Sequence, residues 1–244
     1  MLTALAAPAA AQPDATTATT TAASPTTTTA PAEIKWKTEV EGAIPEDLPG
    51  RWLFVADVRL PDGRPKPVAR TAEITRTADG LDLRLPYETL PTAINQKVEE
   101  ASQKTVEWQP SPEDLKLLAA EWGKGQEVAM DVRAVETRII AGDKFPPEFT
   151  ADEATKDSKF AISVTETYSG RQGAIKSFTS YGVREYGPQS FGGGFVTTTL
   201  AAAPLPVPIT LKGDFKAYRL GSAPQPSSSS WLQNLFSGCG RSKK

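Results

Sequence analysis

Residues 50–60, GRWLFVADVRL, carry the pattern that decides the fold class of this chain. Counting from Trp52, every second residue is apolar, whereas Arg51, Asp57 and Arg59 fall on the opposite face. A period of two residues is typical of a β-strand that turns one face toward a core. The turn signal PDG at 61–63 then predicts that the chain reverses direction after this strand.

Further stretches with strand-like patterns are predicted along the chain, at 68–74, 81–85, 128–132, 160–164, 175–186, 195–200 and 209–220. A helical insertion at about 88–125 separates the strand at 81–85 from the strand at 128–132. Its clearest helix begins at Ser111, a residue type that caps helices. Pro112 follows in the first turn, and Asp114 stands three residues after the cap.

This order of elements favours an all-β fold. About eight strands, joined largely by short turns and without sustained βα alternation, predict an antiparallel up-and-down β-barrel with a helical insertion and a disordered N-terminal leader. A barrel also removes the unpaired edge strands that an open sheet exposes. Another type of barrel or a β-sandwich satisfies the same pattern, so both stay open.

The N-terminal part is low in complexity and is predicted to lie outside the folded domain. Residues 1–11 contain a short apolar stretch that ends in Ala9-Ala10-Ala11, as at a signal-peptidase site, and are predicted to be the remnant of a signal peptide. No basic residue precedes Lys35, and an Ala-rich disordered tail is the alternative. Residues 12–48 are predicted to be a Thr/Ala/Pro-rich disordered linker, because they offer few bulky apolar side chains to offset the entropy of ordering.

The rest of the chain divides into a barrel domain at 49–221 and a C-terminal segment at 222–244. This segment joins a Ser/Pro linker to a short amphipathic tail at 231–236, which is predicted to lie on the barrel wall or to bind an envelope protein partner. No apolar run is long enough for a transmembrane segment. The leader favours an extracytoplasmic location, periplasmic or secreted, where Cys239 would suit an intermolecular disulfide.

Composition excludes several classes of function. The chain has no histidine, which rules out Ser-His-Asp and Cys-His nucleophiles and imidazole-ligated metals or haem. The net charge of -2 leaves no cationic footprint for nucleic acid. Chemistry based on Tyr, Lys and carboxylates alone stays open, but no carboxylate pair can be placed across a cleft. The chain is therefore predicted not to be an enzyme, with no catalytic residue, metal ligand or cofactor.

The opening of the first strand, Gly50-Arg51-Trp52, resembles the G-x-W motif of lipocalin-like (calycin) barrels. The resemblance implies that Trp52 closes one end of the barrel and that Arg219, late in the last strand, packs across it. A guanidinium over an indole face is also a favourable cation–π contact. The chain departs from the family in its long insertion and in lacking the second, Thr-Asp-Tyr-type motif between Tyr168 and Gly187.

Apolar residues on the inward faces of the predicted strands are the candidate ligand contacts. A barrel of this size either holds one small ligand or fills itself with side chains, and the alternation is the same in both cases. The predicted ligand-binding residues are Phe54, Leu83, Leu85, Met130, Phe160, Ile162, Phe178, Phe195 and Phe215.

The sequence thus predicts an exported, non-catalytic, lipocalin-like barrel that binds a small apolar or amphipathic ligand. The alternative is a cell-envelope protein-interaction module in which a filled barrel serves as scaffold. Its binding surface would lie at 115–122 or in the tail at 231–236.

Overall fold

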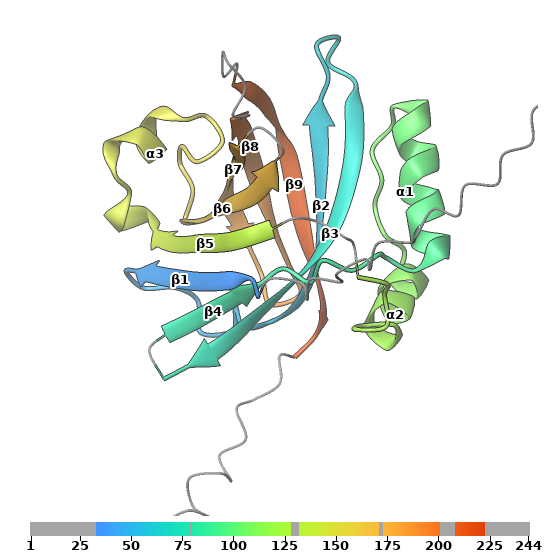
Figure 1. Cartoon of the computed structure of the whole chain (residues 1–244), viewed down its shortest axis with the longest axis horizontal. Coiled ribbons are helices and arrows are strands. Elements are labelled where there is room, and N and C mark those ends of the chain that lie inside the picture. The colour runs from blue at the N-terminus through green and yellow to red at the C-terminus, as the bar shows by residue number, and fades with distance from the viewer. Residues whose placement is uncertain (1–32, 79, 128–131, 171–172, 201–207, 223–244) are drawn as a thin grey trace, which may run out of the picture. The chain divides into compact units, whose positions relative to one another are not determined.

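A computed structural model describes residues 33–78, 80–127, 132–170, 173–200 and 208–222. Within these ranges a single sheet of nine strands is accompanied by short helices (Figure 1). The strands are β1 (Lys35–Glu41), β2 (Gly50–Arg59), β3 (Pro65–Thr77), β4 (Gly80–Arg84), β5 (Val132–Ala141), β6 (Phe160–Gly170), β7 (Gly173–Tyr186), β8 (Ser190–Leu200) and β9 (Ile209–Gly221). The helices are α1 (Thr92–Lys104), α2 (Pro112–Ala120) and α3 (Pro147–Ala151), with a 3-10 turn η1 (Gly142–Lys144).

The sheet curls into a nearly closed barrel, which confirms the predicted all-β barrel class. Its strand order is β1-β5-β6-β7-β8-β9-β2-β3-β4, so β1 and β4 are the two outer strands. These two strands meet through side chains. The Thr38 hydroxyl donates to Asp82 at 3.1 Å and accepts the backbone N–H of Leu83 at 3.1 Å. We call this junction between β1 and β4 the seam.

The barrel is mixed rather than purely antiparallel. β1 pairs with β5 in parallel, whereas the other ladders between named strands are antiparallel. The prediction of a disordered linker over 12–48 is therefore wrong for Lys35–Glu41, which forms a strand. The sequence contains little sign of this strand, because its alternation of half-buried Trp36 and Val40 with exposed charged residues is short. Its partner strand, moreover, lies about 100 residues further along the chain. Residues 12–32, like the signal-peptide remnant at 1–11, lie outside the described residues.

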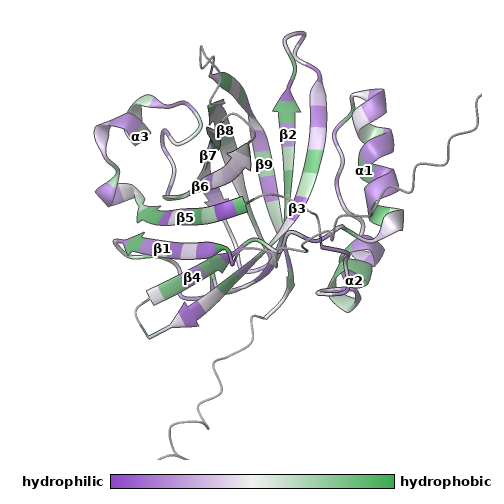
Figure 2. Cartoon of the chain, in the orientation of Figure 1, coloured by the Kyte–Doolittle hydropathy of each residue, from purple (hydrophilic) through white to green (hydrophobic). Residues whose placement is uncertain are grey.

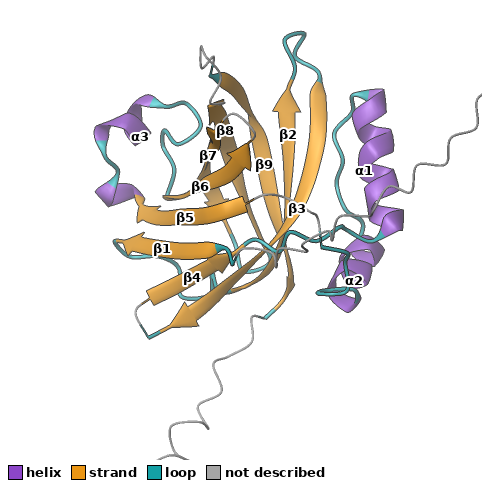
Figure 3. Ribbon diagram, viewed as in Figure 1, coloured by secondary structure: helices purple, strands orange, loops and turns teal. Residues whose placement is uncertain are grey.

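Strand β2 is buried on both of its faces, and this determines where the helices lie. Trp52 and Phe54 point into the barrel core, while Leu53 and Val55 point outward and are also buried. A second apolar cluster covers them, formed with Ile94, Ala101, Trp108 and Leu118 of the insertion. Figures 2 and 3 show α1 beside β3, and α2 contacts β9. The apolar residues on the outward face of β2 thus require a helical layer.

The second helix of the insertion, α2, begins after the capping residue that the sequence predicts. The Ser111 hydroxyl accepts the Asp114 N–H at 3.2 Å, and the Asp114 carboxylate accepts the Ser111 N–H at 3.0 Å, with Pro112 in the first turn. Lys97 of α1 donates to the same carboxylate at 2.6 Å and joins the two helices. No helix in the described part of the chain is long and apolar enough to cross a membrane.

The helical layer gives the first prediction. Leu53→Ala removes a fully buried side chain between β2 and the helices, and we expect a loss of about 3 kcal/mol in the free energy of unfolding. Urea denaturation followed by circular dichroism measures this loss. Leu117→Ala, at a partly exposed position on α2, is the control and should cost less than about 1 kcal/mol. Equal effects of the two substitutions would contradict a buried helical layer.

Candidate functional site

Most of the predicted ligand contacts are buried in one packed cluster inside the barrel. The residues in it are Phe54, Leu83, Leu85, Phe160, Ile162, Phe195 and Phe215. Ring centroids lie 5.3 Å apart for Phe54 and Tyr181, and 5.0 Å apart for Tyr181 and Phe215. Phe191 adds further ring contacts to Phe54, Phe160 and Phe215. These aromatic side chains pack against one another, so they fill this part of the interior.

Phe178 is not part of this cluster, and its prediction as an inward residue is wrong. It lies on the outer face of β7 with 39% of its surface exposed. Alternate residues of a strand share one face, and Tyr181 and Val183 point inward from this strand. Phe178 is an odd number of residues away from both, so it lies on the opposite face. Met130 lies outside the described residues, as do the amphipathic tail at 231–236 and Cys239.

Trp52 and Arg219 meet at one end of the barrel. The guanidinium carbon of Arg219 lies 4.3 Å from the centroid of the Trp52 ring, on the neighbouring strand. The indole Nε1 of Trp52 donates to the carbonyl oxygen of Leu48 at 3.0 Å. Gly50 makes room for this arrangement, because a Cβ at that position would overlap Nη1 of Arg219. The G-x-W sequence thus has a direct steric reason in this chain.

The Arg219 guanidinium also ties two loops to this end of the barrel. It donates to the backbone carbonyls of Asp47 and Pro49, in the loop that leads into β2. It donates as well to the carbonyl of Pro188, in the turn between β7 and β8. With its donors used by backbone carbonyls and its face on an indole, Arg219 has a structural rather than a ligand-binding role.

A second part of the interior is polar. Glu166 of β6 is almost fully buried and accepts from both terminal nitrogens of Arg70, at 3.2 and 3.4 Å. The Tyr87 hydroxyl donates to the same carboxylate at 2.6 Å. Burial opposes ionisation of Glu166, but the Arg70 charge and the hydrogen bonds from Tyr87 and Tyr168 hold its pKa below the ordinary value. The carboxylate is therefore charged at neutral pH.

Tyr87 connects this polar cluster with a groove at the seam. The groove has a volume of about 490 Å³ and takes its aromatic lining from three separate segments. Trp36 comes from β1, Tyr87 from the segment after β4, and Trp122 from the end of the insertion. The rings of Trp36 and Tyr87 lie 6.2 Å apart. We call this the seam groove; among its lining residues Leu85 was a predicted ligand contact, whereas the three aromatic residues were not.

Polar side chains complete the lining of the seam groove. They are Glu73, Arg84, Glu88 and Glu127. Arg84 stacks on Trp36 at 5.2 Å from the ring centroid and is paired with Asp82 at 2.8 Å. The groove therefore combines aromatic walls with charged groups, which is the composition of many small-molecule sites.

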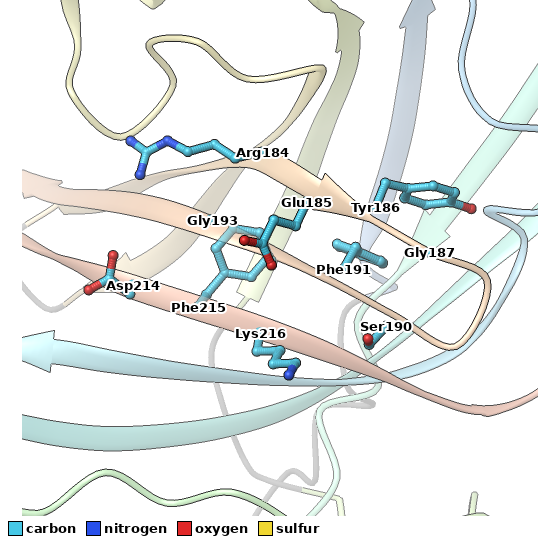
Figure 4. A pocket seen from close by; sticks show the side chains of 11 residues that line it. Arg184, Glu185, Tyr186, Gly187, Ser190, Phe191, Gly193, Asp214, Phe215 and Lys216 are labelled. Atoms are coloured by element: carbon cyan, nitrogen blue, oxygen red, sulfur yellow. The ribbon is translucent and has the colours of Figure 1, made fainter.

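A second groove, of about 510 Å³, lies over the glycine run of β8 and is shown in Figure 4. Gly192 places no side chain there, and its neighbours on the flanking strands are Glu185 of β7 and Lys216 of β9. Its aromatic lining comes from Phe191 and Phe215, whose rings are already packed in the barrel core, and from the half-buried Tyr186. This groove has fewer free aromatic surfaces than the seam groove.

Among the described residues, no three carboxylate or thiol side chains gather closely enough to hold a metal ion.

The three aromatic residues of the seam groove had only weak signals in the sequence. Trp36 stands in the stretch predicted to be a linker, and Trp122 fits the apolar face of the predicted helix. Tyr87 follows a predicted strand without any further pattern. Their proximity depends on how β1 and the insertion meet, which no local pattern encodes.

The buried ion pair gives a second prediction. Arg70→Met leaves Glu166 buried without its cation, and we expect a loss of about 3 kcal/mol in the free energy of unfolding. The double variant Arg70→Met/Glu166→Met should cost less than the sum of the two single variants, because it removes the unpaired charge as well. Chemical denaturation of all four proteins closes this cycle. Additive losses would show that the two side chains do not interact.

The outer face of β2 gives a third prediction, on pH dependence. One carboxylate oxygen of Asp57 is buried without a hydrogen-bond partner. Burial, with a further contribution from the charges of Glu107 and Asp214, raises the pKa of Asp57 from 3.8 to about 6, and Arg59 opposes the shift. A folded-state pKa above the unfolded one means that stability decreases as the pH rises from about 4 to about 6.

Asp57→Asn should remove this part of the pH dependence. We expect a higher melting temperature than that of the unsubstituted protein at about pH 7, and no such gain at about pH 3, below both pKa values, where the carboxyl is mostly protonated in both states. Thermal unfolding across this range measures the difference. Asp143→Asn, at an exposed carboxylate, is the matched control. A pH-independent effect of Asp57→Asn would contradict the raised pKa.

Comparison of the chain with protein-family models, with curated proteins and with solved structures gave no match. The barrel is compatible with a lipocalin-like fold, through its nearly closed sheet and the contact between Trp52 and Arg219. The structure shows the barrel, and relationship to the lipocalin-like family stays a proposal.

Proposed function

We propose that this chain is an exported, non-catalytic, lipocalin-like binding protein that holds a small amphipathic ligand in the seam groove. The observation that carries the proposal is the convergence of Trp36, Tyr87 and Trp122 on one groove from three distant segments. Its volume of about 490 Å³ lies within the range of small-molecule sites. The Thr/Ala/Pro-rich leader supports export.

The interior of the barrel guides the choice of site. One part is filled by packed aromatic rings, and another holds the buried charges of Arg70 and Glu166. An apolar ligand in the first part would have to displace core side chains, and in the second part it would lie against an ion pair. The seam groove offers aromatic surface that is still half-buried, at Trp36, Tyr87 and Trp122.

An amphipathic ligand suits this lining better than a purely apolar one. The aromatic rings would cover its apolar body, while Arg84 and the three glutamates of the lining would contact its polar group. Behind the groove, the hydroxyl of Tyr87 is held by Glu166, which fixes the orientation of that ring. The wall is thus partly preorganised for binding.

The second candidate function is the protein-interaction module, and the packed aromatic interior favours it. The insertion, however, uses part of its apolar surface for the barrel itself. Leu118 is buried against the outer face of β2, and Leu115 packs at the edge of the same cluster. Leu117 is the partly exposed leucine that α2 offers to a partner. This surface is small, so the seam groove is the better-supported site.

The proposal can be tested with a neutral lipophilic dye such as Nile red, after native mass spectrometry of the purified protein for a co-purified ligand. We expect dye fluorescence to rise on binding, and Trp122→Ala to weaken binding about ten-fold, because an aromatic wall is lost. Phe178→Ala is the matched control, since it removes an exposed aromatic ring elsewhere on the barrel. No dye binding, or equal weakening by the two substitutions, would overturn the proposal.

A further inference from the structure

We infer that the ligand of the seam groove carries a cationic group, of the ammonium class, on an apolar body. This inference rests on the proposed function, because it names the chemistry of a ligand for the same groove. It is carried by the charges that line the groove and by the aromatic faces next to them.

The charged side chains that line the groove are Glu73, Glu88, Glu127 and Arg84, three negative charges and one positive. Two of them already have partners. Glu73 accepts from Arg51 at 3.0 Å, and Arg84 is bound to Asp82 at 2.8 Å.

The opposite charges within each of these two ion pairs cancel, so the charges that remain are those of the Glu88 and Glu127 carboxylates. Within the described ranges, neither has a cationic partner within ion-pair distance. The groove is therefore left with an excess negative charge beside its aromatic walls.

The backbone holds these two carboxylates near each other. Glu88 and Glu127 occupy directly paired positions of a short antiparallel bridge. Thr89 reinforces it, donating its N–H to the carbonyl of Gln126 at 2.8 Å and accepting the N–H of Gln126 on its hydroxyl at 3.0 Å. Gly125 allows this close approach, because a Cβ there would overlap the carbonyl oxygen of Thr89. Like charges at directly opposite positions destabilise such a pairing, and a bound cation would relieve their repulsion.

The aromatic walls are suited to the same charge. A guanidinium already lies 5.2 Å from the centroid of Trp36 and another 5.2 Å from that of Trp122, contributed by Arg84 and Arg51. Tyr87 adds a third ring close to Trp36. Cations bind the faces of electron-rich rings, and quaternary ammonium ligands are commonly held between such rings. An anionic ligand would meet the excess negative charge instead.

The test uses three probes with one alkyl chain and different head groups, each below its micelle concentration. They are octyltrimethylammonium, octyl glucoside and octyl sulfate, titrated into the full chain by calorimetry. We expect the ammonium probe to bind most tightly and the sulfate least tightly, with the preference for ammonium decreasing at high salt. Glucoside or sulfate binding as tight as ammonium binding would overturn the inference and leave the proposed function standing. Failure of all three probes to bind would overturn both.

Variants assign the preference to the two free carboxylates. Glu88→Gln/Glu127→Gln should weaken binding of the ammonium probe about five-fold and leave binding of the glucoside probe unchanged. Glu185→Gln is the control, because it removes one negative charge at the other groove (Figure 4). An equal loss in the control would show a general charge effect and overturn the inference. Retained glucoside binding reports that the double variant is folded.

Discussion

The contact between Arg219 and Trp52 is the interaction on which the rest of this barrel depends. It joins the last strand to the second strand and, through backbone carbonyls, holds the loop before β2 and the turn between β7 and β8. Gly50 is part of the same arrangement, since a side chain there would occupy the space of the guanidinium. One cation thus closes one end of the barrel with an aromatic face below it and carbonyl oxygens around it.

The interior that lies beyond this end is divided between apolar packing and a buried ion pair. The aromatic cluster around Phe54 and Phe191 excludes water by ring-to-ring contact, whereas Arg70 and Glu166 satisfy each other across the lumen with help from Tyr87. Outside these two parts, the half-buried rings of Trp36, Tyr87 and Trp122 gather at the seam groove.

The seam is a direct consequence of the strand order. β1 and β4 are the two outer strands of the sheet and meet through side chains such as Thr38. Trp36 and Tyr87 line the seam groove, and the insertion, held against β2 by its own apolar cluster, supplies Trp122 as the third wall. The same insertion that stabilises the outer face of β2 thus also completes the groove, so stability and the proposed binding site share one structural element.

The sequence by itself determined the strands with clear alternation, the all-β class, the capped helix at Ser111 and most of the inward apolar residues, because these follow from local periodicity and propensity. Only the tertiary structure decided the parallel pairing of β1, the outward side of Phe178 and the seam groove. A period of two defines two faces of a strand but neither its partner nor, where both faces carry apolar residues, the face that turns inward. The groove depends on contacts between segments far apart in the chain, and those contacts exist only once the barrel has formed.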